Sequence, residues 1–428
     1  MRNKISIKEY LNTEVKDYAK YVLYNRAIPN IIDGLKPSQR KLLYTATKIA
    51  KNKKVKTAAL SGACINMANY HHGNASLDSA ATTMAMDWKN QIPLFDGKGN
   101  FGSRLVNEPA ASRYTAVQLS ESFNKYFKDN EILFNQTDPE DPEPLFYLPL
   151  IPWVLVNGVT GIATGFATKI FPRNVNQIID SCIKHLESKP TKDLIPTFPN
   201  FRGDVKAQNG KYIVSGTIER QTQTKLSITE LPLGIERDKY LEHLEKLKND
   251  KSIVRYTEEC SDNGFLFHIV LPNSSKDLTE SELFDLFKLQ DSYTENITVI
   301  DESGSLKVFD KVQDLIKHFV NVRLGFYKTR YERLIRLAQD EMKWLLVKSK
   351  FIKEMMNEDL NELTRKELKS ITENYEFSDR LFNLKIYNFN KDEINNINNK
   401  MVDIENDIKK WQTIDYTQTY INELKLLK

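Results

Sequence analysis

Residues 25–50 read NRAIPNIIDGLKPSQRKLLYTATKIA and carry the most readable structural signals in the chain. The Asp33-Gly34 pair is typical of a tight turn, and Pro37 suits the first position of a helix, where no N–H is needed. Apolar residues then follow at helical spacing up to Ala50: Leu42, Leu43, Ala46 and Ile49. The stretch therefore predicts a turn followed by an amphipathic helix that begins at Pro37.

Two further helices are expected on either side of this stretch. Residues 5–24 place apolar side chains at near-helical spacing, namely Tyr10, Val15, Tyr18 and Val22. A helix from Ser76 is indicated by the spacing of Leu77, Ala80, Ala81, Met84 and Trp88. The helix from Pro37 and the helix from Ser76 are both short. Together with a turn and a basic surface, they favour a helix-turn-helix or winged-helix module.

The distribution of charge says more than the net charge of +4, which is small for 428 residues. From Gly34 to Leu77 the chain has no Asp or Glu, yet it holds Lys36, Arg40, Lys41, Lys48, Lys51, Lys53, Lys54 and Lys56 there. Unopposed cations of this kind are typical of a surface that binds the phosphates of DNA or RNA. The alternative is an ordinary solvated basic face on a pair of helices.

The composition excludes several classes of protein. With 40% apolar and 28% charged residues, the chain is neither disordered nor collagen-like. The three cysteines, Cys64, Cys182 and Cys260, are far apart, which argues against a disulfide framework or a cysteine zinc site. The N-terminus lacks the apolar region of a signal peptide, and glycines interrupt the apolar stretch from Leu148 to Phe171. We therefore expect an intracellular protein without a membrane span.

Beyond the basic stretch, the chain changes character. The acidic, proline-rich segment from Thr137 to Phe146 is typical of an extended loop and a domain boundary. Between Gly203 and Val308, strand-like pieces at 225–229, 265–270 and 297–299 mix with helical segments, as in an α+β layer. The expected fold class is therefore multidomain α+β.

The C-terminal part has the apolar repeat of a coiled coil. Spacings close to alternating three and four residues run from Val320 to Ile352 and again from Ile394 to Trp411. Two such seams, about forty residues apart, predict an antiparallel arm with a globule at its tip. Two ordinary core helices are the alternative.

The sequence shows no motif for binding a nucleotide or a metal ion. Residues 97–102 match GxGxxG, but a helix around Trp88 is expected before them and Ser103 to Val106 continues like a strand. A dinucleotide site needs the opposite order, strand before and helix after, so we reject it. The sequence contains no P-loop, HExxH or DxD motif.

Two residue pairs remain ambiguous on their own. His71 and His72 precede the Ser76 helix, where they could contact phosphate at the helix N-terminus or simply cap the helix. The pair Arg113-Tyr114 is unspecific, although a tyrosine that attacks phosphate needs a cation beside it to stabilise the developing charge.

Taken together, six segments in one order and spacing resemble the DNA breakage-reunion core of type IIA DNA topoisomerases. They are NRAIPNIIDGLKPSQRKLLYTA (25–46), YHHGNASL (70–77), DGKGNFGSR (96–104), AASRYT (110–115), GVTGIATGFATKIFPRN (158–174) and ITELPLGI (228–235). The match is dense over residues 25–175 and sparser over 200–330. Within the family, the resemblance is closest to the split-subunit enzymes of T-even-type phages.

The resemblance implies a division into domains. It predicts an N-terminal helical arm over residues 1–24, a winged-helix DNA-cleavage domain over 25–150 and an α/β tower domain over 151–308. An antiparallel coiled-coil arm would follow over residues 309–428 and carry a C-terminal dimer gate, the globule at about residues 353–393.

It also implies roles for individual residues. Tyr114 matches the nucleophile that forms a 5′-phosphotyrosyl bond, Arg113 matches the residue that stabilises the scissile phosphate, and His72 matches a catalytic residue near the reacting centre. Ile170, on an expected loop, matches an apolar wedge that bends DNA beside the cut. The cleaved DNA would be held by Arg26, Lys36, Arg40, Lys41 and His71.

The activity implied is ATP-dependent relaxation and decatenation of double-stranded DNA by a homodimer, through a transient double-strand break. Mg²⁺ and ATP would be bound by partner subunits with TOPRIM and ATPase domains, because this sequence lacks their motifs and no metal site is expected in it. We expect no membrane contact and a cytoplasmic, nucleoid-associated location, in the host cytoplasm if the chain is phage-encoded. The alternatives are a winged-helix DNA-binding or structural protein that does not cleave, and a tyrosine recombinase, whose helical pattern is not found.

Overall fold

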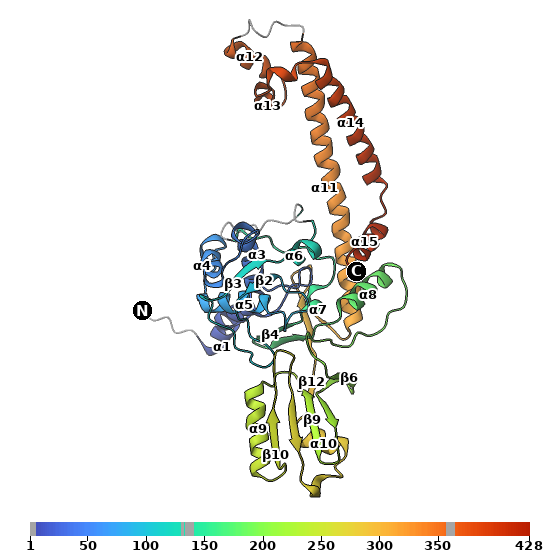
Figure 1. Cartoon of the computed structure of the whole chain (residues 1–428). Coiled ribbons are helices and arrows are strands. Elements are labelled where there is room, and N and C mark those ends of the chain that lie inside the picture. The colour runs from blue at the N-terminus through green and yellow to red at the C-terminus, as the bar shows by residue number, and fades with distance from the viewer. Residues whose placement is uncertain (1–5, 130–131, 133–140, 357–363) are drawn as a thin grey trace, which may run out of the picture. The chain divides into compact units, whose positions relative to one another are not determined.

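The computed structural model describes residues 6–129, 132, 141–356 and 364–428 (Figure 1). The chain divides into two compact units, one of Met1–Arg323 with Glu423–Lys428 and one of Leu324–Asn422. The acidic segment that we predicted as a boundary, Thr137 to Phe146, lies in part outside the described residues.

The described chain begins with a helix that contains two wide π-helical turns. Its consecutive segments are α1 (Ile7–Tyr10), η1 (Leu11–Val15), α2 (Lys16–Val22) and η2 (Leu23–Ala27). The helix predicted for residues 5–24 is confirmed over its described part. Its apolar face is largely open to solvent, because Tyr10 and Tyr18 are 52% and 61% exposed.

Three helices and a small sheet form the body that follows. The helices are α3 (Pro37–Ile49), α4 (Thr57–Met67) and α5 (Asn74–Ala85). The antiparallel sheet has the order β1-β3-β2, with β1 (Val55–Lys56), β3 (Ala116–Leu119) and β2 (Phe95–Lys98). The helix predicted from Pro37 is confirmed, with Pro37 in its first turn and Leu42, Leu43 and Ala46 fully buried.

Our expectations for the residues around the glycine-rich segment are partly wrong. The helix predicted from Ser76 is α5, but it ends at Ala85, before Trp88, and strand β2 leads into the glycines. Ser103 to Val106 form no strand, because Gly102 and Ser103 turn the chain there instead, with the Ser103 N–H donating to the Val106 carbonyl at 2.7 Å. A turn followed by a loop leaves no helix to bind a dinucleotide.

A β-hairpin lies against the N-terminal helix. Strands β4 (Val159–Ala163) and β5 (Phe166–Ile170) form it, between α7 (Trp153–Val156) and α8 (Val175–Leu186). Gly161 permits the close packing, because a Cβ at this position would lie 1.9 Å from the carbonyl oxygen of Ala27 in η2. The short helix α6 (Glu121–Tyr126) and the pair β13 (Ile297–Ile300) and β14 (Leu306–Phe309) complete this part.

Residues 204–293 form two antiparallel sheets. The first has the order β10-β11-β9-β8, with β8 (Thr217–Arg220), β9 (Lys225–Glu230), β10 (Arg255–Glu258) and β11 (Phe267–Val270). Helices α9 (Arg237–Asn249) and α10 (Glu280–Leu286) share its apolar core (Figure 1). The second has the order β12-β7-β6, with β6 (Asp204–Gln208), β7 (Lys211–Ser215) and β12 (Gln290–Tyr293). The strands predicted at 225–229, 265–270 and 297–299 are confirmed as β9, β11 and β13.

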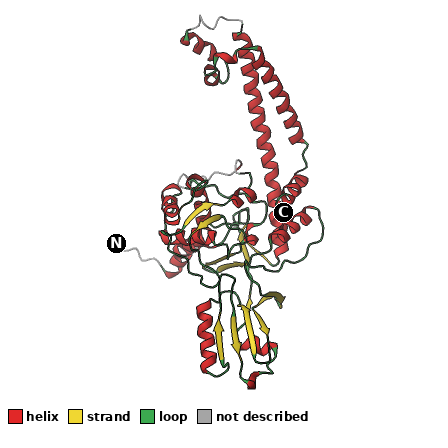
Figure 2. Cartoon of the chain, in the orientation of Figure 1, coloured by secondary structure: helices red, strands yellow, loops and turns green. Residues whose placement is uncertain are grey.

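Helices joined by short loops make up the second unit, and its described residues contain no strand (Figure 2). Its elements are α11 (Val312–Met355), which starts in the first unit, α12 (Arg365–Thr372), α13 (Ser378–Phe382), α14 (Lys391–Gln412) and α15 (Tyr416–Lys425). The two helical segments predicted at 320–352 and 394–411 lie within α11 and α14, which share one apolar core. Among the described helices, none is both long and apolar enough to cross a membrane.

Candidate functional site

Tyr114 stands on an exposed turn that is fixed by a buried neighbour. The Tyr114 N–H donates to the Ala111 carbonyl at 2.8 Å, and the ring is 66% exposed. Thr115 is buried, and its carbonyl accepts from the N–H of Thr57 at 3.0 Å. The two threonine hydroxyls are also 2.8 Å apart. The backbone of the turn is therefore held while the Tyr114 residue stays mostly exposed.

Arg113 places a positive charge on the face of this tyrosine. Its guanidinium carbon lies 4.7 Å from the centre of the Tyr114 ring, and Arg113 is itself exposed. A cation in this position is suited to stabilise the negative charge that builds up when a phosphate is attacked. The two residues predicted as nucleophile and phosphate-stabilising residue are thus brought together.

A residue that the sequence reasoning missed links this turn to α5. The hydroxyl of Ser112 donates to Asp78 Oδ2 at 2.8 Å, and the N–H of Ala58 donates to the Ser112 carbonyl at 3.3 Å. Asp78 is 34 positions away in the sequence, so no local pattern pointed to it. α5 also begins directly after His72 and Gly73, so one helix connects the histidines with the tyrosine turn.

His72 is held by two residues of the N-terminal helix. Its Nε2 lies 2.8 Å from the hydroxyl of Tyr21, and Arg26 Nη2 lies 3.0 and 3.1 Å from the two ring nitrogens. Burial, followed by the charges of Arg26 and His71, lowers the pKa of His72. Arg26, His71 and His72 line one hollow of about 520 Å³. Three of the residues predicted from the sequence therefore meet at the N-terminal end of α5.

Lys36 lies beside this hollow, in a neighbouring groove of about 540 Å³. Its Nζ donates to the carbonyl of Thr160 in β4 at 2.7 Å, and burial lowers the pKa of this amine. The groove runs between α3, α5 and the β4–β5 hairpin, and Arg26 also lines it. These positions agree with a surface that contacts an anion along α3 and α5.

Arg40 and Lys41, predicted to contact DNA, are instead buried in ion pairs. Arg40 is 7% exposed, and its Nε and Nη2 donate to the Asp33 carboxylate at 2.7 and 3.1 Å. Lys41 Nζ donates to Asp141 at 2.6 Å and pairs with Glu143 at 2.9 Å. Carboxylates from outside the acid-free stretch 34–77 therefore neutralise both residues in this structure.

A family model for the A-type chain of DNA gyrase/topoisomerase IV matches residues 26–426. The chain belongs to this family. It is 34% identical over 441 residues to the DNA topoisomerase medium subunit of Enterobacteria phage T4, covering 100% of this chain and 99% of the relative. It is 31% identical to the mitochondrial DNA topoisomerase 2 of Dictyostelium discoideum, covering 99% of this chain but 35% of the relative.

A solved structure supports the same family. The DNA-binding, cleavage and re-ligation domain of Plasmodium falciparum topoisomerase II superposes with a TM-score of 0.88 at 26% identity, covering 99% of this chain and 64% of that one. This topoisomerase subunit therefore has the mixed α and β fold of that cleavage domain, and the family predicted from its sequence is confirmed.

The residue predicted as a DNA-bending wedge in this topoisomerase subunit is buried in a strand. Ile170 lies at the end of β5, not on a loop, and is 2% exposed. Its side chain also lines the groove that contains Arg26 and Lys36. Ile162, on the partner strand β4, is 81% exposed. The alternation of side chains along a strand could have pointed to an exposed Ile162, because residues 161 and 162 must face opposite sides of the hairpin.

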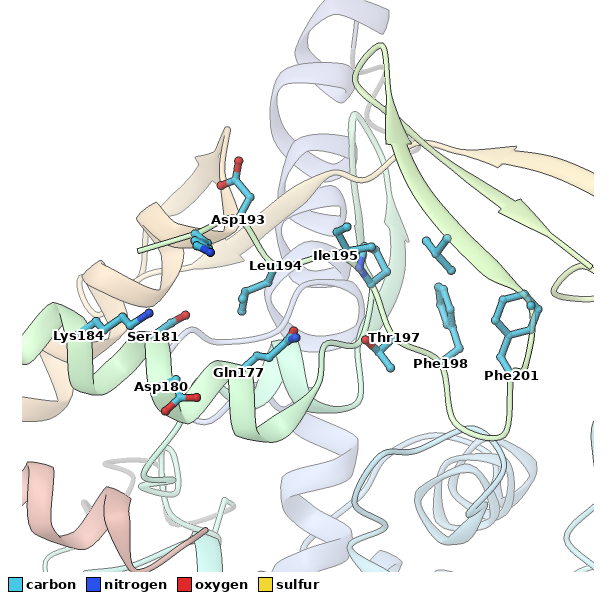
Figure 3. A pocket seen from close by; sticks show the side chains of 14 residues that line it. Gln177, Asp180, Ser181, Lys184, Asp193, Leu194, Ile195, Thr197, Phe198 and Phe201 are labelled. Carbon is cyan, nitrogen blue, oxygen red and sulfur yellow. The ribbon is translucent and has the colours of Figure 1, made fainter. Parts of the chain in front are cut away.

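A separate cavity of about 460 Å³ lies between α8 and the chain after it (Figure 3). Gln177, Ser181 and Lys184 line it from α8, and Thr197, Phe198 and Phe201 line it from the following segment. None of the residues predicted as catalytic or DNA-binding lines this cavity. Within the described ranges, no group of three or more His, Cys, Asp or Glu side chains is placed to hold a metal ion.

Proposed function

We propose that this chain is the DNA-cleaving subunit of an ATP-dependent type IIA DNA topoisomerase. The hydroxyl oxygen of Tyr114 attacks a phosphate of one DNA strand, a 5′-phosphotyrosyl bond forms, and the 3′-hydroxyl leaves. Two copies of the chain, acting as a homodimer, cut both strands of a duplex so that a second duplex can pass. Resealing reverses the attack, and the net result is relaxation and decatenation.

The observation that carries this proposal is the stacked pair Arg113–Tyr114 on an exposed turn of a family member. The tyrosine is accessible to a duplex, and the cation lies where charge develops on the phosphate. Removing one preorganised charge donor of this kind slows a reaction by roughly 10²–10³-fold. His72 acts from the N-terminal end of α5, where backbone N–H groups and the helix dipole favour a bound phosphate.

DNA is held by the basic residues that line the neighbouring hollow and groove. Arg26, Lys36 and His71 contact phosphates in this proposal, whereas Arg40 and Lys41 support the fold. Ile162 takes the role of the wedge, because it is the exposed isoleucine of the hairpin beside Lys36. Unstacking one base step is estimated at a few kcal/mol, and the bend repays it by bringing more protein surface onto the duplex.

We assign the finer architecture of the family to the elements described above. Residues 25–150 form the winged-helix cleavage domain behind the helical arm 1–24, and residues 151–308 form the tower. Residues 309–428 form the antiparallel coiled-coil arm, whose globule at about 353–393 is the dimer gate. Part of that globule lies outside the described residues.

Mg²⁺ and ATP belong to partner subunits in this proposal. The described residues around Tyr114 do not fit a metal site, because no group of three or more His, Cys, Asp or Glu side chains is placed there to hold an ion. A TOPRIM-bearing subunit therefore holds Mg²⁺, and an ATPase domain on that or another subunit drives strand passage. The name of the T4 relative, a medium subunit, supports a split enzyme that works in the cytoplasm of the host.

The Tyr114→Phe variant tests the proposal. Only one oxygen is lost, so this variant should fold, bind duplex DNA and assemble with its partner, yet form no adduct in SDS-trapped cleavage reactions with Mg²⁺. Tyr18→Phe is a matched control, since Tyr18 is 61% exposed and should leave the adduct yield unchanged. A covalent adduct from Tyr114→Phe at the wild-type level would place the nucleophile elsewhere. If the wild-type complex also forms none, the chain is a non-catalytic DNA-binding protein, the alternative function.

A further inference from the structure

The loop between β2 and β3 carries Tyr114 near its end. The loop is closed at its base, where Lys98 pairs with Ala116 and the N–H of Ala110 donates to the Asn100 carbonyl at 3.0 Å. Its tip, at residues 102–107, turns at Gly102, whose φ is +77°. A Cβ on Gly102 would lie 2.6 Å from the Asn107 carbonyl oxygen, so the tip is tightly folded. Tip and nucleophile therefore belong to one closed loop.

Arg104 projects from this tip into the four-stranded sheet. Its Nη2 donates to Glu230 Oε1 at 2.9 Å and to the Leu231 carbonyl at 3.0 Å. Its guanidinium carbon lies 5.1 Å from the ring centre of Phe201 and 5.6 Å from that of Phe265. The side chain is 14% exposed. A charged hydrogen bond between two aromatic rings, largely out of water, is a strong anchor.

The sheet side of this anchor is itself fixed. Glu230, whose side chain is 4% exposed, also accepts from the N–H of Leu231 at 2.9 Å and from the N–H of Arg202 at 3.0 Å. The loop has a second backbone attachment, because the N–H of Arg237 donates to the Leu105 carbonyl at 3.1 Å. Leu105 packs against the apolar core of the sheet. The tip is thus attached to the sheet and its core at several points, through Glu230, Leu231, Arg237 and the packing of Leu105.

We propose that Arg104 is a positioning residue for DNA cleavage, which ties the loop that carries Tyr114 to the sheet β10-β11-β9-β8. This inference rests on the proposed function. Tyr114 is mostly exposed, so the backbone of its loop sets where the hydroxyl lies relative to a phosphate. A displacement of about 1 Å at a reacting group can slow a reaction by roughly 10²-fold. Arg104 touches no reacting atom in this scheme and acts through the loop.

The test compares Arg104→Ala and Arg104→Lys in the complex assembled with the metal-binding partner subunit and Mg²⁺. We expect Arg104→Ala to slow adduct formation at least about tenfold with saturating DNA, while DNA affinity changes less than about twofold. Arg104→Lys should recover part of the rate, because it keeps the charge but not the flat face that stacks between the rings. Arg202→Ala is the matched control, since Arg202 contacts Glu230 through its backbone and should cleave normally.

Hydrogen exchange on the chain alone provides a readout that does not depend on activity. Arg104→Ala should speed exchange of the amides at 111–115 and leave those of β9 unchanged. Cleavage at the wild-type rate by Arg104→Ala would overturn the inference while leaving the proposed function intact. DNA affinity that falls in parallel with the rate would also overturn it, since Arg104 would then contact DNA. Absence of an adduct from the wild-type complex would overturn the proposed function and this inference together.

Discussion

Four basic residues that were all predicted to act on DNA, Arg40, Lys41, Arg26 and Arg113, are placed in two different ways by the structure. Arg40 and Lys41 are buried against Asp33, Asp141 and Glu143, so their charges are used within the fold. Arg26 and Arg113 are exposed and lie against His72 and Tyr114. The difference teaches that a carboxylate-free stretch of sequence does not make a carboxylate-free surface.

The buried pair should matter most for stability. Asp33→Ala removes both acceptors of the Arg40 guanidinium and also the carboxylate that accepts from the N–H groups of Leu35 and Tyr147. Leaving a buried charge without its partner typically lowers the free energy of unfolding by roughly 3–5 kcal/mol. Urea unfolding followed by circular dichroism measures this loss. A stability close to wild type would mean that Arg40 finds solvent or DNA instead.

The exposed pair should matter for chemistry and not for folding. Arg113→Ala should slow adduct formation by roughly 10²–10³-fold, because one preorganised charge donor is lost. Its unfolding curve should stay within experimental error of wild type, since the side chain is exposed. If Arg113→Ala cleaves normally, or unfolds at a lower urea concentration than wild type, Arg113 supports the fold as Arg40 and Lys41 do.

The hairpin offers the same contrast in apolar residues. Ile170→Ala empties a buried site, so stability should fall toward the lower end of roughly 2–5 kcal/mol, because the site borders an open groove. Ile162→Ala should leave stability unchanged and reduce DNA bending, measured by FRET between labels at the two ends of a duplex. Normal DNA bending by Ile162→Ala would show that Ile162 is not the wedge.

The smallest effect concerns the protonation of His72. Its pKa is lowered by burial first and by Arg26 second, so Arg26→Ala should raise it part of the way toward its ordinary value. Because the folded-state pKa is the lower one, His72 favours folding above the unfolded-state pKa of about 6.5, and this contribution is lost as the pH falls below that value. An NMR titration of the ring protons follows the change. An unaltered His72 pKa in Arg26→Ala would show that the charge of Arg26 does not act on the His72 ring.

Local rules predicted what depends on neighbours in the sequence. The start of α3 follows from the Asp33-Gly34 turn and Pro37, and the helices α11 and α14 follow from their apolar repeats. Partners distant in the sequence could not be predicted. Glu143 lies 102 positions from Lys41, and Glu230 lies 126 positions from Arg104. The exposure of Ile162 could have been predicted, because alternation along the strand places it on the opposite face from the buried Gly161.

The wide turn η2 has a geometrical consequence for the site. In a regular α-helix, residues five apart point about 140° away from each other around the axis. Tyr21 and Arg26 are five apart, yet both contact His72, and the Arg26 guanidinium lies 5.5 Å from the Tyr21 ring. The π-helical turn supplies the extra residue that brings Arg26 round to the side of Tyr21. The count of residues between Tyr21 and Arg26 is therefore part of the site, and deleting one of residues 22–25 would rotate the Arg26 charge away from His72 without removing any side chain in contact with it.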